Sequence, residues 1–235
     1  MNTAMRIELS CDETSIKEPN WIPEKYGSDG GRLPYSKTQI HGPEGATGLC
    51  PVSNLDWFLS AVNLGSMRVF GIDCGTEVTG FGVVDSHETV RGPRLECCAK
   101  GAIRLAKTQP LPERLEQVFR ELSSGLERWQ PDAVAIEEVF YSVNAKSALK
   151  LGQVRGVALL AAARRGIPVA EYAPLQIKSS VVGYGMASKE QVQFMVARLL
   201  SMAELPEPPD AADALALAIC HIHTAQTLAA QGATR

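Results

Sequence analysis

Four acidic side chains occupy positions from which they can share one site. Asp73 ends an apolar run that starts at Arg68, and Glu137 ends a second apolar run. Asp210 and Asp213 are three residues apart, so on a helix they project from nearly the same face. Acids gathered in this way are costly unless a cation lies among them, and hard divalent cations prefer such all-oxygen ligands. The four acids therefore predict a two-metal phosphodiester hydrolase.

Taken singly, each acid has a more ordinary explanation. Asp210 can cap a helix, where the helix dipole favours an ionised acid, with Asp213 incidental. A lone acid at a strand end, such as Asp73, is commonly structural. Glu138 follows Glu137 directly, and neighbours on a strand face opposite sides, so only one of the two reaches a shared site. The prediction depends on the whole set, in its order of strand, strand and helix.

Apolar periodicity predicts the elements that hold these acids. We expect a hairpin from residues 68–73 and 78–85, and further strands at 95–105, 133–137 and 167–172. Helices are expected from Pro112 to Pro131, from about 144 to 165, from the capping box Ser188-Lys-Glu-Gln191 onward, and from about Pro209. Strands first, then alternating helices and strands, indicate an α/β fold with a mixed sheet covered by helices.

Residues 1–66 differ in composition from the rest of the chain. They are rich in Gly, Pro, Ser, Asn and Asp, without a long stretch of helical or strand period. We expect a disordered or mis-assigned N-terminal extension here, with Met67 as the natural start. Residues 67–225 are expected to form the folded domain, and 226–235 a short flexible tail. No apolar run approaches the roughly 20 residues of a membrane span. The cysteines show neither a CxxC pair nor zinc-ligand spacing, which indicates free thiols in a cytoplasmic protein.

Charge is unevenly distributed along the chain. The net charge is −3, but residues 1–66 hold five basic and eight acidic residues, and the remainder holds 18 of each. Between residues 141 and 200 only Glu171 and Glu190 oppose eight basic residues, which are Lys146, Lys150, Arg155, Arg164, Arg165, Lys178, Lys189 and Arg198. This excess predicts either a phosphate-binding face for nucleic acid or an ordinary solvated helical surface, and the composition leaves both open.

Four segments carry a pattern that is specific to one family. They are residues 70–83 (FGIDCGTEVTGFGV), 135–140 (AIEEVF), 144–156 (NAKSALKLGQVRG) and 210–216 (DAADALA). In this order they resemble the RuvC family of bacterial Holliday junction resolvases, from Met67 to about Thr224. The resemblance implies a ribonuclease-H-like mixed sheet flanked by helices, a homodimer, and Mg²⁺-dependent cutting of four-way DNA junctions by symmetric paired nicks. It also implies work with a branch-migration complex of RuvA and RuvB.

The same resemblance carries catalytic and metal-binding roles onto Asp73, Glu137, Asp210 and Asp213. Four carboxylates can hold two Mg²⁺ ions per subunit, or Mn²⁺, roughly 4 Å apart. The products would carry a 5′-phosphate and a 3′-hydroxyl. Lys189 is expected at the reacting centre, with an ordinary surface lysine as the alternative. DNA contacts are expected from Phe140, Lys146, Lys150, Arg155 and Lys178.

Several details of these segments leave alternatives open. Phe140 either stacks on an unpaired base or packs in the core. Gly152 and Gly156 each cost up to about 1 kcal/mol in a helix, so we expect close packing there, at a twofold dimer interface or against the protein's own sheet. His221 and His223 are interpreted as surface or helix-capping groups rather than metal ligands. Cys74, Glu77 and Glu138 depart from the common family pattern.

Two other functions compete with a nuclease. The loop Asp73-Cys-Gly-Thr76 beside a hairpin has the form of the phosphate loop of actin-type and sugar-kinase-type ATPases. Those proteins need two such domains and a late glycine-rich adenosine motif, for which this chain is too short. The second alternative is a junction-binding scaffold without activity, against which the presence of all four acids argues.

Overall fold

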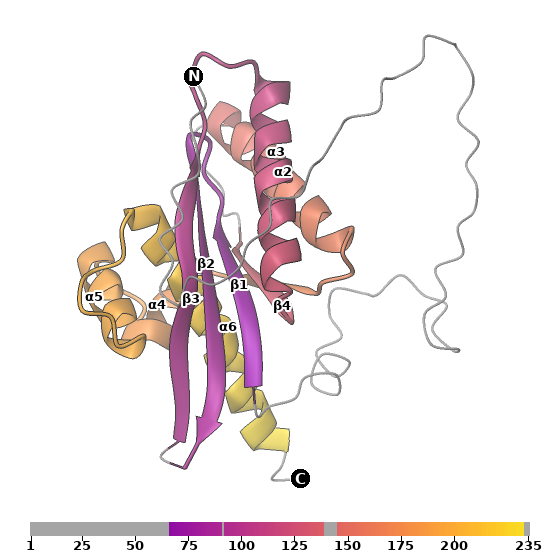
Figure 1. The fold of residues 1–235 in the computed structure, drawn as a ribbon. Coiled ribbons are helices and arrows are strands. Elements are labelled where there is room, and N and C mark those ends of the chain that lie inside the picture. Colours follow the sequence, from indigo (N-terminus) through magenta and orange to yellow (C-terminus); the bar gives the residue numbers. More distant parts are fainter. Residues whose placement is uncertain (1–65, 91, 139–144, 233–235) are drawn as a thin grey trace, which may run out of the picture. The chain divides into compact units, whose positions relative to one another are not determined.

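A mixed β-sheet forms the centre of the described part of the chain (Figure 1). The computed structural model describes residues 66–90, 92–138 and 145–232. The strands lie in the order β3-β2-β1-β4-β5, which are Gly92–Arg104, Val78–Thr89, Ser66–Asp73, Ala133–Glu137 and Val169–Tyr172. The first three strands in sequence pair antiparallel, whereas β4 and β5 run parallel to β1. The predicted α/β class with a mixed sheet is confirmed.

Helices cover both faces of this sheet because side chains alternate across each strand. Phe70 and Ile72 of β1 pack into one core with α2 (Leu111–Trp129) and α3 (Ala145–Ala163). Val69, which precedes Phe70, belongs to the second core. That core is built with α4 (Pro174–Val182), α5 (Lys189–Leu199) and α6 (Pro209–Gly232). The fold is therefore a sheet between two helical layers.

Helix α6 lies unusually close to the sheet because glycines face it. A Cβ placed on Gly71 of β1 would lie 1.9 Å from the carbonyl oxygen of Ala214. A Cβ on Gly80 of β2 would lie 2.0 Å from the carbonyl oxygen of Asp210. Any larger residue at either position would push α6 away. The two glycines thus set how near the N-terminal turns of α6 come to β1 and β2.

Several helix boundaries follow the predicted signals. Ser188 accepts a hydrogen bond from the Gln191 backbone amide, and the Gln191 side chain accepts one from the Ser188 amide, which completes the capping box of α5. Helix α2 has proline in its first turn and ends at Gln130, which is in the left-handed conformation. Helix α4 was missing from the prediction, although Pro174 at its start and the buried pair Ile177 and Val181 are typical of a short helix.

The C-terminal segment differs from the prediction. Helix α6 continues to Gly232, so residues 226–232 of the expected tail are helical. Gln226 donates a hydrogen bond to Ser86 of β2. His221 is buried and bonded to the hydroxyl of Tyr172, so its interpretation as a surface or capping group is wrong. His223 is partly buried and hydrogen-bonds Ser180. This region is buried because α6 packs in the second core, to which Ile222 and Ala225 also belong.

The N-terminal extension expected at residues 1–66 lies, except for Ser66, outside the described residues. Ser66 and Met67 open strand β1. In the part of the chain that is described, no helix is both long and apolar enough to cross a membrane.

Candidate active site

Asp73 and Glu137 lie at the same end of the sheet. Strands β1 and β4 are parallel neighbours, with Ile72 paired to Ile136, and each acid is the last residue of its strand. Parallel strands place their carboxyl ends at one edge of a sheet, so the two acids lie side by side. Apolar residues precede both acids because the strands are buried on both faces.

Helix α6 brings the other two acids to this edge. Asp73 pairs across the hairpin with Gly80, and Gly80 lies against the backbone of Asp210. Asp210 is in the first turn of α6, and Asp213 follows one turn later. All four predicted acids therefore come from the C-terminal ends of β1 and β4 and the N-terminal turns of α6.

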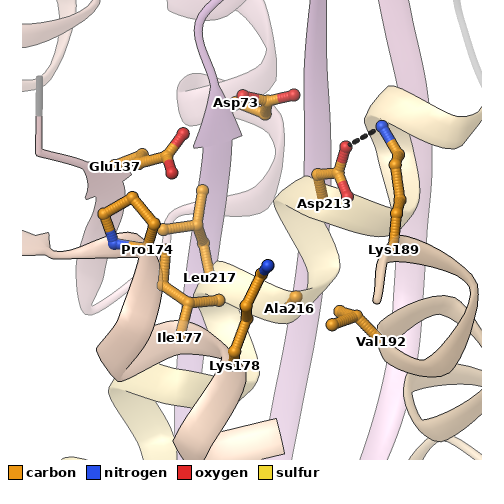
Figure 2. A pocket seen from close by; sticks show the side chains of 10 residues that line it. All are labelled: Asp73, Glu137, Pro174, Ile177, Lys178, Lys189, Val192, Asp213, Ala216 and Leu217. Atoms are coloured by element: carbon orange, nitrogen blue, oxygen red, sulfur yellow. Dashed lines mark ion pairs between the residues drawn. The ribbon is translucent and has the colours of Figure 1, made fainter. Parts of the chain in front are cut away.

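A pocket of about 270 Å³ opens among these elements. Figure 2 shows the carboxylates of Asp73, Glu137 and Asp213 around one space, with the side chains of Lys178 and Lys189 beside them. Its other lining residues are Pro174, Ile177, Val192, Ala216 and Leu217. Asp210 does not line the pocket, but its charge contributes to the raised pKa of Asp73. The pocket combines acids with two cations from α4 and α5.

Burial and mutual repulsion make the acids hard to ionise together. Burial, then the charges of Asp213, Glu137 and Asp210, raise the pKa of Asp73 to about 7, although Lys189 opposes this. Burial, then Asp213, also raise the pKa of Glu137, and Lys178 opposes the rise. Carboxylates that disfavour one another's charge in this way favour a cation between them.

Lys189 supplies one such cation from within the protein. Its ammonium lies 2.6 Å from Asp213, and this hydrogen bond raises the pKa of Lys189. Across the described residues, no three or more His, Cys, Asp and Glu side chains are gathered into a ready-made metal-binding group. The acids nevertheless fit a hard cation by donor type and by their mutual repulsion. Their side chains would need to turn toward it, and Lys189 would need to release Asp213.

Arg155 contacts the sheet rather than open solvent. Its Nε donates to the carbonyl oxygen of Glu137 at 3.3 Å, and its guanidinium forms an ion pair with Glu171 of β5. Only 16% of its side chain is exposed. Arg155 therefore ties α3 to the ends of β4 and β5, and a role in positioning Glu137 fits this geometry better than a direct phosphate contact.

The other residues predicted to contact DNA lie in different surroundings. Lys178 lines the pocket, and Lys150 is exposed on α3. Phe140 lies outside the described residues, and so does the side chain of Lys146. Glu138, which departs from the family pattern, is exposed.

Two further cations of the basic segment are engaged on the protein itself. Arg164 lies over the Phe119 ring and Arg165 pairs with Glu127.

The turn after Asp73 contains residues that sequence reasoning missed or left open. Arg114 of α2 donates to the carbonyl oxygen of Thr76, which holds the β1–β2 turn against α2. Nothing in the spacing of Arg114 indicates this contact. Burial, then the Asp73 charge, raise the pKa of the Cys74 thiol to about 12, so this thiol is neutral beside the acids.

The buried bond between Tyr172 and His221 was also not predicted. Burial lowers the pKa of His221 to about 4. Tyr172 pairs with Glu137 in the sheet, so the bond links the strand end beside Glu137 to α6. The apolar neighbours of His221 in the sequence were the available signal for its burial.

Comparison with known proteins places the chain in one family. A family model for the crossover junction endodeoxyribonuclease RuvC matches residues 69–221. The crossover junction endodeoxyribonuclease RuvC of Acidobacterium capsulatum is 68% identical over 168 residues, covering 70% of this chain and 98% of that protein. Its counterpart in Koribacter versatilis is 60% identical over 162 residues, covering 69% and 96%.

Solved structures agree with this match. The structure of Thermus thermophilus RuvC in complex with a Holliday junction substrate has a TM-score of 0.65 and 34% identity, covering 69% of this chain and 97% of that chain. The yeast mitochondrial Holliday junction resolvase Ydc2 has a TM-score of 0.51 at 15% identity, which is a likeness of fold alone.

The sheet order and its flanking helices define a protein of the ribonuclease-H-like fold. Within that class, the chain belongs to the RuvC family of crossover junction endodeoxyribonucleases, which are metal-dependent nucleases that resolve Holliday junctions. The predicted family is confirmed, and the kinase alternative is excluded.

Proposed function

We propose that the chain resolves four-way DNA junctions with Asp73, Glu137, Asp210 and Asp213 as its catalytic, metal-binding acids. One observation carries this proposal. Acids from two strand ends and one helix meet at one edge of the sheet, and burial together with their charges raises the pKa of Asp73 to about 7. Such coupling has little structural benefit, because each acid destabilises its neighbours until a cation neutralises them.

Mg²⁺ is the proposed cofactor, with two ions per subunit and Mn²⁺ as a substitute. When bound, such a pair supplies an activated water and stabilises the leaving 3′ oxygen, which gives 5′-phosphate and 3′-hydroxyl ends. The protein's own residues do the rest. The four carboxylates fix the position of the cations, and Lys178 faces the phosphate from α4. Lys189 exchanges its partner Asp213 for the scissile phosphate, so its positive charge stays in the pocket throughout.

A homodimer fits the exposed face of α3. Leu149, Gly152, Gly156 and Leu160 follow one another at intervals of three and four residues, and all are exposed. A Cβ on either glycine would meet no atom within 4 Å among the described residues. Packing against the protein's own sheet therefore does not explain these glycines. A second copy related by a twofold axis would cover these four residues, which we call the α3 stripe. It would also supply the paired site that symmetric nicks require.

The remaining partners follow from the substrate. A junction-cutting enzyme must reach DNA while the crossover moves, so a RuvA and RuvB branch-migration complex is the proposed assembly. The cytoplasm is the proposed location, because bacterial chromosomal DNA lies there.

Cleavage of a labelled four-way junction tests the proposal. We expect the full chain to cut it symmetrically in Mg²⁺, to leave plain duplex intact, and to produce ends that ligase can seal. Asp73→Asn should abolish cutting while it retains junction binding. If Asp73→Asn cuts at the rate of the parent, the acid assignment is wrong. If the unaltered chain binds the junction without cutting it, the scaffold alternative holds. A chain that starts at Met67, run beside the full chain, measures the contribution of the preceding residues.

A further inference from the structure

We propose that Leu175, Tyr184 and Met186 form an apolar platform beside the acid pocket that receives an unstacked DNA base next to the scissile phosphate. This inference rests on the proposed function and extends its substrate recognition. It assigns the preference for junctions over duplex partly to these three residues, which we call the α4–α5 platform.

The three platform side chains are large, apolar and exposed. The exposed fractions are 60% for Leu175, 46% for Tyr184 and 85% for Met186. The loop between α4 and α5 folds back over α4, so the backbone between Tyr184 and Met186 lies next to Leu175. A Cβ on Gly185 would lie 3.4 Å from Leu175 Cδ2 and 3.3 Å from Ser179 Oγ. Several exposed apolar side chains on neighbouring segments mark an interaction site more often than a lone exposed residue does.

Tyr184 is held in place rather than left to move. Its hydroxyl donates to Gln191 Oε1 at 2.8 Å, and the same oxygen accepts from the Ser188 amide at 2.8 Å. Gln191 is the third residue of the capping box of α5, so the Tyr184 ring is fixed to a helix start. A ring that is exposed and fixed loses little entropy when it stacks on a ligand.

The platform is carried by the segments that border the acid pocket. Pro174, which precedes Leu175, lines that pocket together with Lys178 and Lys189. Figure 2 shows Pro174 near Glu137, Lys189 on the opposite side of the pocket beside Asp213, and Lys178 between them. Residues 173–189 contain two lysines and no acid. Phosphates held by the lysines would place a neighbouring nucleotide over the apolar side chains.

The chemistry favours DNA with an open base face over other ligands. In duplex DNA the base faces are covered by stacking, and only backbone and groove edges are free. At a crossover or an unpaired position a base can leave the stack, and an aromatic side chain then replaces its neighbour. The platform lies on the opposite face of the sheet from α3, so the proposed dimer leaves it uncovered.

The test uses the full chain carrying Asp73→Asn, so that binding is measured without cutting. Tyr184→Ala should weaken binding to a four-way junction by about 10-fold and leave binding to plain duplex unchanged. Tyr184→Phe, which keeps the ring and loses its hydrogen bond, should retain most of the affinity. Met186→Ala and Leu175→Ala should each give smaller losses in the same direction. Phe194→Ala is the matched control, since Phe194 is a 52% exposed aromatic residue of α5 that lies outside the platform, with its ring covered by Arg198.

A fluorescent base reports the contact directly. With 2-aminopurine beside the crossover, the parent should change the fluorescence and Tyr184→Ala should not. Unchanged affinity and unchanged fluorescence in Tyr184→Ala, with native unfolding behaviour, would overturn the platform. Equal losses of affinity for the junction and for the duplex would also overturn the platform, since they indicate a general phosphate contact. A change of oligomeric state in Tyr184→Ala would assign the surface to self-association instead. If the parent fails to bind junctions at all, the proposed function fails first, and the platform fails with it.

Discussion

Gly80 and Asp210 are in backbone contact across the junction of sheet and helix. A Cβ on Gly80 would lie 2.0 Å from the carbonyl oxygen of Asp210, and Gly80 is the hairpin partner of Asp73. One position without a side chain therefore sets the separation between the acid of β1 and the acids of α6. The catalytic geometry depends on a residue that contributes no functional group.

Gly80→Ala is expected to impair cutting of the junction while junction binding is retained. The added methyl must displace the start of α6, because backbone atoms block it, and overpacking of this kind costs about 1–3 kcal/mol. We expect a lower unfolding temperature and a loss of cleavage of at least about 100-fold, as small misplacements in active sites commonly cause. Junction affinity should change little, because Lys178 and the exposed lysines stay in place. Full activity in this variant would show that the approach of α6 does not limit catalysis.

The raised pKa of Asp73 predicts a specific dependence of stability on pH. The pKa is 3.8 for the ordinary side chain and about 7 in the folded, metal-free protein. Between these values the folded protein keeps a proton that the unfolded chain has released. The free energy of unfolding should therefore fall as the pH rises through this window and then level off. Thermal unfolding in EDTA from pH 5 to pH 8 measures this slope.

Asp73→Asn is the matched variant for this measurement. It should unfold at a higher temperature than the parent at pH 8 and show a shallower slope, with the remainder contributed by Glu137, whose pKa is also raised. Mg²⁺ should bind the parent more tightly at pH 8 than at pH 6, with proton release visible by calorimetry. A parent and variant with identical pH slopes would contradict the coupling among these acids.

Arg155 is expected to act through Glu137 rather than through DNA. Arg155→Gln removes both its bond to the Glu137 carbonyl and its ion pair with Glu171. We expect a large loss of cutting with a modest loss of junction affinity, and partial recovery in Arg155→Lys. A higher Mg²⁺ requirement in Arg155→Gln would mark a positioning role.

Glu171→Gln supplies the control for Arg155. In a double-mutant cycle the two substitutions should be non-additive, because they break the same ion pair. Additive losses on junction affinity, with a reduced salt dependence for Arg155→Gln, would instead identify Arg155 as a phosphate contact.

The exposed stripe of α3 predicts the effect of charge at the dimer interface. Leu149→Arg places a charge on the stripe, where two copies would bring like charges together. We expect dissociation to monomers in analytical ultracentrifugation and loss of symmetric paired nicks, with an unchanged unfolding temperature at low concentration. Leu205→Arg, at another exposed leucine outside the stripe, should leave the parent's association state unchanged.

The sequence was sufficient to predict the acids because strand ends are marked by local composition. Asp73 and Glu137 each close a short apolar run, and the capping box at Ser188 marks the start of α5. Such signals depend on neighbours along the chain. They also fixed the strands and most helices to within a few residues.

The missing details depend on contacts between distant segments. Arg155 meets Glu137 and Glu171 only because α3 crosses the ends of β4 and β5. His221 is buried because α6 packs against β5, where its ring bonds the Tyr172 hydroxyl. The pairing of Lys189 with Asp213 likewise requires α5 and α6 to meet. A sequence pattern within one segment does not encode contacts between distant segments.

The direction of β1 has a practical consequence for work with this enzyme. The strand begins at Ser66 and ends at Asp73, so its two ends are separated by about 23 Å at about 3.3 Å per residue. An affinity tag or a fluorescent label joined ahead of Ser66 would start at the edge of the sheet farthest from the acids. Attachment at that end is the natural choice for surface immobilisation or single-molecule work, whereas additions near Asp210 would obstruct catalysis.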